Sequence, residues 1–419
     1  MPSRLTHSPD GKSMSRQEWS GCRYSYKRPI YVAAKILVFV AAVLLGEQQF
    51  ASAQSAQPGS VNQQTSLHAP LRDKGLPRKQ PSNNRHTVGL VAGPAYSTEF
   101  AMMQDIATVL SKGQETGPHG ETALQVLPMV GTGGDRNILD VLTLANADLA
   151  IAPVVLANRL RDARTFGDIR RKLVYITLLH TEEFHLLVRQ DIRNIADLDG
   201  KTVSLGEQDS AGDVLGREVF GAAGVKVKAV NLDLDAALDQ MQRGQISAAL
   251  LLSGKPVKPL LTLNARLQAL HFLPIPYSQA LARDFLPSKL QHADYPNIIA
   301  DGESVDTVAI EAALFAYNWP ARSQRFELLD NFTQSFFSRF LELHEDSHHP
   351  KWREINLAAK LPGWKRFGPA ERWLDRQSMG EALPRSGATG DPNSTGNSSE
   401  QNDKLFREFL RWREQQQAK

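Results

Sequence analysis

The sequence predicts an α/β fold in two lobes, each a mainly parallel sheet flanked by helices. Short apolar runs alternate with helical patterns from residue 87 onward, and the alternation occurs twice, over 88–152 and over 201–252. Alternating strands and helices are typical of a parallel sheet covered by helices. The two stretches also end alike, with NADLA at 146–150 and GQISA at 244–248. This weak internal similarity places two sheet carboxyl ends on two lobes, where they can face each other; the alternative is two ordinary helix-to-strand junctions.

In the first stretch, residues 88–92, 124–130 and 149–152 are apolar runs of strand length. Ser97 or Thr98 can cap a helix that extends to about residue 110, because a hydroxyl accepts hydrogen bonds from free N–H groups. The glycine-rich turn GTGG at 131–134 precedes a second predicted helix. Its apolar residues recur three and four positions apart, at Ile138, Val141, Leu142 and Ala145.

In the second stretch, strands are predicted over 201–205, 225–232 and 246–252, with helices from Ser210 and over 234–241. Two strands, 173–179 and 184–188, carry the chain into this lobe, and residues 270–276 return it. The remaining predictions are a strand or helix start over 305–315 and an amphipathic helix over 322–343. The predicted boundaries are therefore 87–182 for the first part of lobe 1, 183–270 for lobe 2, and 271–379 for the return and C-terminal helices.

The N-terminus has the features of a secretory signal peptide over residues 1–53. A basic region precedes an apolar run over 30–46 that only Lys35 interrupts, and a small-x-small site follows at 51–53. The 11 residues after Lys35 are short for a membrane span. The alternative is an uncleaved anchor in the inner membrane, facing the periplasm. Residues 54–86 predict a flexible linker, and 380–419 a mostly disordered tail whose 405–412 segment forms a marginal helix or docks on a partner.

Composition excludes several classes of protein. With 42% apolar and 22% charged residues, the chain is neither a multi-span membrane protein nor fully disordered. Its formal net charge is +3, but without residues 1–53 it holds 41 basic and 42 acidic residues, a net charge of −1. Nucleic acid is therefore not an expected partner. The single cysteine, Cys22, lies in the predicted signal peptide, so no disulfide or thiolate site is expected after cleavage.

Several short motifs occur in order along the chain: Gly93 with Tyr96, GTGG at 131–134, NADLA at 146–150, IADLDGKTV at 195–203, Gly206 with Ser210, and GQI at 244–246. In this order they resemble the TAXI family of TRAP-transporter solute receptors. The likeness covers about 87–339 and is sharpest at DLDGK, 197–201. The sequence departs from the family where Ser-Ala-Gly at 210–212 replaces Ser-Gly-Thr, and where Ser247 replaces Asp.

The resemblance implies a type II periplasmic binding protein fold with a ligand cleft between the lobes. It implies a monomeric receptor that captures a small carboxylate or amino acid in the periplasm and delivers it to the membrane permease of a TRAP transporter. Known family ligands are glutamate, glutamine and C4- or related carboxylates. No catalysis, cofactor or metal is implied. The alternative of another class is a periplasmic ligand-sensing domain that reports to a signalling partner.

The predicted ligand site lies beyond the carboxyl ends of the strands, where open α/β sheets bind their ligands. The loops 93–97 and 131–135 lead into helix N-termini, whose free N–H groups favour a carboxylate. Tyr96 offers an aromatic wall, and Ser210 either contacts the ligand or caps its own helix. Asp209 and Asp213 beside it would repel an anion and favour a ligand with an amine. The candidate residues are Gly93, Tyr96, Ser97, Thr132, Gly133, Gly134, Pro153, Ser210, Ala211 and Gly212.

One motif suggests zinc hydrolysis instead, because HEDSH at 344–348 matches the zinc-protease pattern H-E-x-x-H. Pro350 ends any helix there and the flanking residues are polar, so we expect this segment to be catalytically silent. The GTGG turn lacks the Gly-Lys-Ser/Thr of a phosphate-binding loop, and no G-x-S-x-G motif occurs. His180 and His185, which flank Glu182 and Glu183, are predicted to be structural or solvated.

Overall fold

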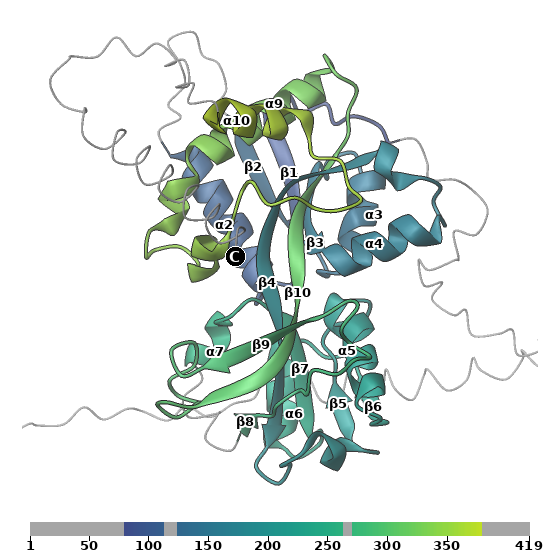
Figure 1. Cartoon of the computed structure of the whole chain (residues 1–419), viewed down its shortest axis with the longest axis vertical. Helices are drawn as coiled ribbons and strands as arrows, with labels where there is room; N and C mark the ends of the chain where they lie inside the picture. Colours follow the sequence, from purple (N-terminus) through teal and green to yellow (C-terminus); the bar gives the residue numbers. More distant parts are fainter. Residues whose placement is uncertain (1–78, 113–123, 263–269, 379–419) are drawn as a thin grey trace, which may run out of the picture. The chain divides into compact units, whose positions relative to one another are not determined.

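The structure is a computed structural model, and it describes residues 79–112, 124–262 and 270–378. The predicted signal peptide, the linker up to residue 78 and the predicted tail lie outside the described residues. Within the described residues the predicted two-lobed α/β fold is confirmed. Of the described residues, 79–112, 124–180 and 311–378 form a first lobe, 183–262 and 270–308 form a second lobe, and two long strands connect them (Figure 1).

In the first lobe, β1 (Thr87–Ala92) lies between the parallel strands β2 (Gln125–Val130) and β3 (Leu149–Pro153). Alternate residues of β1 face opposite sides of the sheet, as strand geometry requires. Leu90 packs in the hydrophobic cluster with α2 (Thr98–Ser111), and Val91 packs in the cluster with α3 (Asp135–Thr143) and α4 (Val154–Ala163). Helices therefore cover both faces of this sheet.

In the second lobe, β7 (Ala248–Ser253) and β6 (Lys228–Val230) flank β5 (Thr202–Ser204), and all three are parallel. The helix α5 (Ala211–Ala222) packs in one hydrophobic cluster of this lobe, and α6 (Leu234–Gln242) and α7 (Lys258–Thr262) pack in the other. β8 (Leu270–Phe272) and β9 (Leu286–Gln291) complete the lobe.

Two long antiparallel strands connect the lobes. β4 (Leu173–Arg189) spans 17 residues and β10 (Ser304–Tyr317) spans 14. In Figure 1 they run side by side between the lobes, where Ile310 pairs with Glu182. The sequence suggested two strands, 173–179 and 184–188, but the polar residues between them continue the same strand. A buried strand can cross such a stretch when its backbone hydrogen bonds continue.

The return to the first lobe lies later than the sequence suggested. Residues 270–276 were expected to cross back, yet Leu270 and Phe272 pack in the second-lobe core and pair with β4. Pro274 and Pro276 cannot donate ladder hydrogen bonds, so β8 ends at Phe272 and is too short to cross. The crossing is made by β10, within the segment predicted as a strand or helix start.

The C-terminal segment covers the first lobe. α9 (Gln324–Ser338), a 3₁₀ helix at Phe340–His344, another at Pro350–Glu354, and α10 (Gly368–Ser378) follow β10. The sequence predicted one helix over 322–343, but its last turn is 3₁₀. Phe340 and Leu343 are three residues apart and both enter the core, a spacing that suits 3₁₀ geometry.

Residues 79–86 were assigned to the flexible linker, but Lys79 is anchored to the first lobe. Its Nζ donates to Val141 O at 2.7 Å and to Ala147 O, and it lies 4.8 Å from the ring centre of Tyr317. Burial lowers the pKa of Lys79 to about 8. Composition alone did not reveal this contact, because a single lysine in a polar stretch carries no periodicity.

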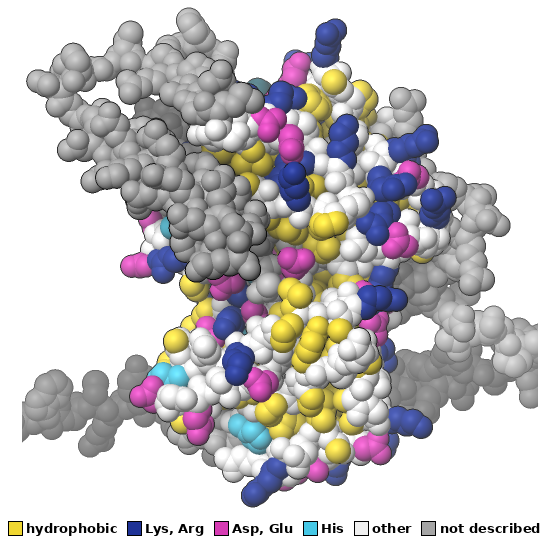
Figure 2. Space-filling view, in the orientation of Figure 1, with side chains coloured by type: hydrophobic (Ala, Val, Ile, Leu, Met, Phe, Trp, Pro, Cys, Tyr) yellow, Lys and Arg dark blue, Asp and Glu magenta, His cyan; other side chains and the backbone are white. Residues whose placement is uncertain are grey.

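Charged side chains are mixed on the surface. Figure 2 shows Lys and Arg gathered over the side of the first lobe where α3 and α4 lie, with acidic side chains among them. Several are paired: Arg161 with Asp162, Arg170 with Asp168, and Arg136 with Asp140. Among the described helices, none combines the length and apolar character that a membrane span requires.

Candidate functional site

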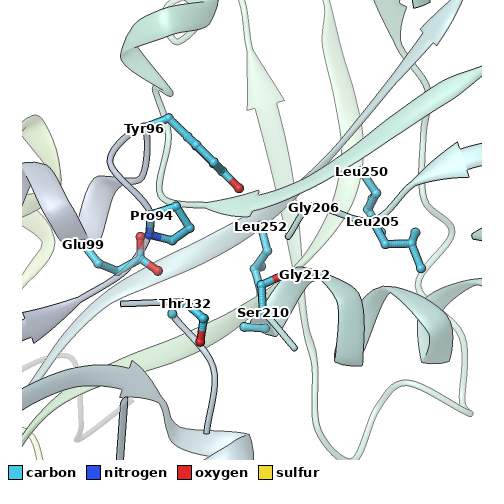
Figure 3. A pocket seen from close by; sticks show the side chains of 12 residues that line it. Pro94, Tyr96, Glu99, Thr132, Leu205, Gly206, Ser210, Gly212, Leu250 and Leu252 are labelled. Carbon is cyan, nitrogen blue, oxygen red and sulfur yellow. The ribbon is translucent and has the colours of Figure 1, made fainter. Parts of the chain in front are cut away.

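Loops of both lobes line one small cavity (Figure 3). In the first lobe the lining comes from the loop between β1 and α2, the first turn of α2 and the loop before α3. In the second lobe it comes from the loop between β5 and α5, the start of α5 and the strand β7. The lining residues are Pro94, Tyr96, Glu99, Thr132, Gly133, Leu205, Gly206, Ser210, Ala211, Gly212, Leu250 and Leu252.

The turn before α3 approaches the second lobe closely. Gly133 has φ of +74°, a conformation that glycine adopts without strain. A Cβ on Gly134 would lie 2.7 Å from Asp209 O and 3.3 Å from Ala211 N, both in the second lobe. The side chain of Asn137 fixes this turn, since its Nδ2 donates to Ala92 O at the end of β1 and to Ile151 O within β3. Backbone therefore meets backbone across the cleft.

On the second lobe, Ser210 is the N-cap of α5. Its Oγ accepts a hydrogen bond from Asp213 N at 3.1 Å, so the capping role that the sequence left open is filled. The first N–H groups of a helix have no partner within the helix. Here they belong to Ala211 and Gly212, which both line the cavity. The positive end of the α5 dipole is thus directed at the cavity.

Tyr96 reaches from the first lobe to the second. Its ring packs against the second-lobe cluster, and its hydroxyl would lie 3.8 Å from a Cβ on Gly206. Figure 3 shows the hydroxyl directed into the space between the lobes. Burial, together with the negative charges of Glu207 and Glu99, raises the pKa of Tyr96, so the hydroxyl remains a hydrogen-bond donor.

Direct contacts hold the lobes together around the cavity. Thr98 N donates to Ser253 Oγ at 2.9 Å, and Thr98 Oγ1 donates to Gly254 O at 2.6 Å. At the rim, Arg159 of α4 makes a bidentate ion pair with Glu218 of α5 and a further contact with Asp284 at 2.9 Å. These contacts bring the two lobes together beside the cavity, so the structure shows closed lobes.

Six of the ten candidate residues line the cavity, namely Tyr96, Thr132, Gly133, Ser210, Ala211 and Gly212. The other four are not among the lining residues. A Cβ on Gly93 would contact Ser97 and Glu99, and Ser97 caps α2 by accepting from Phe100 N. Gly134 approaches the second lobe before α3, and Pro153 precedes α4. Which of these residues contact a ligand stays a prediction.

Six lining residues were not among the candidates: Pro94, Glu99, Leu205, Gly206, Leu250 and Leu252. Of these, Pro94 lies within the predicted loop 93–97, and Gly206 belongs to a motif of the family resemblance. The three leucines lie in predicted strands, where apolar residues indicated only a hydrophobic core. Glu99 follows the cap Ser97, where an acidic residue is expected to favour the helix N-terminus, so nothing marked it as part of a site. Asp213, expected to repel an anion, is paired with Arg217 at 2.7 Å.

Glu99 belongs to a buried cluster of ionisable groups. Glu99, His180 and Glu182 are each at most 3% exposed, and one ligand atom of each lies within 4.8 Å of the others. Burial, and secondarily the charge of Glu99, raises the pKa of Glu182 well above its usual value. Burial lowers the pKa of His180, so its ring is neutral. His180 and Glu182 are two apart on β4 and thus share one face.

The other histidines singled out in the sequence have structural partners. The 3₁₀ helix ends at His344, so the HEDSH segment does not form one α-helical face. His348 Nδ1 lies 3.0 Å from Asp105 Oδ1. His185 is buried and its Nε2 lies 2.7 Å from the hydroxyl of Tyr295, which fits the predicted structural role.

Comparisons with solved structures find chains that are similar to this one at low identity and low TM-score. A mutant of ArgBP from T. maritima is 14% identical with a TM-score of 0.38, covering 64% of this chain and 96% of its own. PhnD1 from Prochlorococcus marinus, in complex with methylphosphonate, is 12% identical with a TM-score of 0.41, covering 71% and 100%. An ABC transporter substrate-binding protein from Streptococcus pneumoniae with bound histidine is 14% identical with a TM-score of 0.38, covering 66% and 95%.

No curated protein matches the sequence. A family profile does match, over residues 90–361, which is well over half of the chain and includes all twelve residues of the cavity lining. The profile is described as the NMT1-like family, and the matched region runs from β1 to the segment before α10. The chain therefore belongs to the NMT1-like family.

Proposed function

We propose that this protein is an exported solute receptor. It captures a small carboxylate or amino-acid-like metabolite between its lobes and delivers it to the membrane permease of a TRAP-type secondary transporter. The observation that carries the proposal is the meeting of the α5 N-terminus, the GTGG turn and Tyr96 at one cavity. The TRAP assignment rests on the motif resemblance described above.

The lining suits a small ligand with one carboxylate. Helix N-termini bind carboxylates through unpaired N–H groups, and the GTGG turn leaves its backbone accessible. The hydroxyl of Tyr96 adds a directed donor, while Leu250 and Leu252 offer an apolar wall. The lining includes no Lys or Arg and one carboxyl group, Glu99. A ligand with several negative charges is therefore disfavoured relative to a monocarboxylate or an amino acid.

Opening must precede binding, because the contacts of Thr98 with Ser253 and Gly254 hold the two lobes together beside the cavity. The crossing segments of β4 and β10 are the only covalent connections between the lobes within the described residues, so they form the hinge of this proposal. A ligand that contacts both lobes favours the closed state. A receptor of this kind needs a binding surface on each lobe and a hinge between the lobes. It needs no chemical step.

A thermal-shift screen of residues 54–419 against amino acids, monocarboxylates, dicarboxylates and keto acids tests this function. A true ligand at a hundred times its dissociation constant adds about 2.7 kcal/mol of stability. We expect hits among amino acids or monocarboxylates with one site per chain. If no compound of these classes stabilises the folded protein, the proposed ligand class is wrong. Uptake of the hit by cells with and without this chain then tests delivery.

A further inference from the structure

We propose that Glu99, His180 and Glu182 bind one divalent transition-metal ion, of which Zn²⁺ is the best-suited example. The cluster lies where α2 of the first lobe meets the crossing strand β4, directly behind the cavity. The proposal concerns the metal ion itself and does not depend on which ligand enters the cleft.

The first argument is unmet hydrogen bonding. Both ring nitrogens of His180, both carboxylate oxygens of Glu182 and Oε2 of Glu99 are buried without a hydrogen-bond partner. Buried polar atoms are almost always paired, because an unpaired one costs its full desolvation free energy. Five such atoms from three adjacent side chains require a common explanation. A metal ion accepts several lone pairs at once, which one proton or one hydrogen bond does not.

The second argument is charge. No described Lys or Arg forms a salt bridge with Glu99 or Glu182. The cation that acts electrostatically on Glu182 is Lys351, and it already contacts Thr181, Glu183 and Glu354, at 3.1, 2.8 and 2.8 Å. A buried carboxyl group that is neither paired with a cation nor bound to a metal takes up a proton instead, and the raised pKa of Glu182 follows from this. When both carboxyl groups are ionised, they carry with the neutral imidazole a charge of −2, which a divalent cation balances.

The third argument is geometry. When a tetrahedral metal ion forms bonds of about 2.1 Å to nitrogen and oxygen, its ligand atoms lie about 3.4 Å from one another. The three ligand atoms lie within 4.8 Å of one another, so they need to converge by at most about 1.4 Å. Small rotations of the three side chains supply that movement. One imidazole with two carboxylates suits Zn²⁺ and neighbouring transition metals, whereas Mg²⁺ and Ca²⁺ prefer oxygen ligands alone.

Such an ion would change the electrostatics of the cleft. Glu99 lines the cavity, and its Oε1 lies on the cavity side, 3.8 Å from a Cβ on Gly133. A cation behind Glu99 neutralises the carboxyl groups that otherwise repel an anionic ligand. It also connects α2 to β4, next to the contacts that Thr98 makes with the second lobe.

Metal binding by the tag-free full chain, stripped with chelator and then dialysed, tests the proposal. Titration calorimetry with ZnCl₂ and elemental analysis should give one Zn²⁺ per chain and a higher thermal midpoint. The variant Glu182→Gln keeps the side-chain shape and removes one ligand, and His180→Gln removes another. We expect each to weaken Zn²⁺ binding by at least about 100-fold, since even outer-shell changes cost 10- to 100-fold.

The matched control combines His344→Gln with His348→Gln. It removes two histidines of the HEDSH segment, which lie outside the cluster, and it should retain the bound Zn²⁺. Circular dichroism verifies that each variant is folded. If His180→Gln does not fold, X-ray absorption of the Zn²⁺-loaded control still shows whether one imidazole nitrogen ligates the metal. No Zn²⁺ binding by the wild type overturns the proposal and leaves a shared proton between the two glutamates. Binding that persists in folded Glu182→Gln and is lost in the control overturns it as well.

Discussion

Replacing Gly134 with alanine would place a methyl group between the two lobes. The new Cβ would lie 2.7 Å from Asp209 O and 3.3 Å from Ala211 N. The backbone of Gly134 has φ of −97°, which any L-residue adopts, so the first lobe itself should fold normally. The substitution therefore acts on lobe closure and leaves the lobes themselves intact.

The size of the effect follows from this contact. Carbon and oxygen atoms normally approach no closer than about 3.3 Å, so the lobes must separate by roughly 0.6 Å at this point. Overpacking of a tight interface typically costs about 1–3 kcal/mol. Because the cost falls on the closed state, the affinity for a ligand held by both lobes should fall about 5- to 150-fold.

Calorimetric titration with the ligand from the screen measures this change. The matched control is Gly221→Ala in α5, where an added Cβ would meet no atom within 4 Å. That control should bind as the wild type does, with a slightly more stable helix. Wild-type affinity in a folded Gly134→Ala variant would refute the reasoning, since the ligand would then not require the closed contact.

Three further predictions concern closure, pH and export. Arg159→Ala should remove the interlobe ion pairs with Glu218 and Asp284 and weaken lobe closure by at most about 1 kcal/mol. X-ray scattering should then show a larger radius of gyration. An unchanged radius of gyration and an unchanged ligand affinity would exclude a role of Arg159 in closure. Burial lowers the pKa of His349 to about 4, so the unfolded chain binds more protons between pH 4 and 6.5 and stability should fall as the pH falls through that range. Denaturant titrations should show a smaller loss in His349→Gln, and an equal loss would contradict the assignment. Mass spectrometry of the cell envelope should find a chain that starts near Gln54, whereas full-length protein confined to the cytosol would contradict export.

Much of the fold could be predicted from the sequence because the apolar periodicities are local. The strand β1, the helix α3 and the caps Ser97 and Ser210 follow from patterns of a few residues. The return crossing could not be predicted in this way. The apolar residues around Leu270 do not show which strand they pair with, and the partner of β8 lies about 80 residues earlier in β4.

In the candidate site, too, local patterns could be predicted from the sequence and tertiary contacts could not. The GTGG turn and the start of α5 were found because glycine-rich turns before helices have a recognisable pattern, and both reach the cavity. Glu99 was missed. His180 and Glu182 were noticed, but His180 was predicted to be structural or solvated, because residues 180–183 were expected to separate two strands whose faces could not be assigned. The two-residue spacing of His180 and Glu182 on one strand face was therefore not used. Placing Glu99 beside them requires the tertiary packing of α2 against β4.

Hydrogen–deuterium exchange with and without the screened ligand tests the central claim most directly, because it locates protection along the whole chain. The account predicts slower exchange in both lobes at once, over residues 93–99 and 131–135 in the first and over 205–213 in the second. It predicts little change in the surface groove around Lys79 and Arg171, which lies on the first lobe away from the cleft residues. Protection confined to one lobe, or centred on that groove, would contradict a ligand held between the lobes.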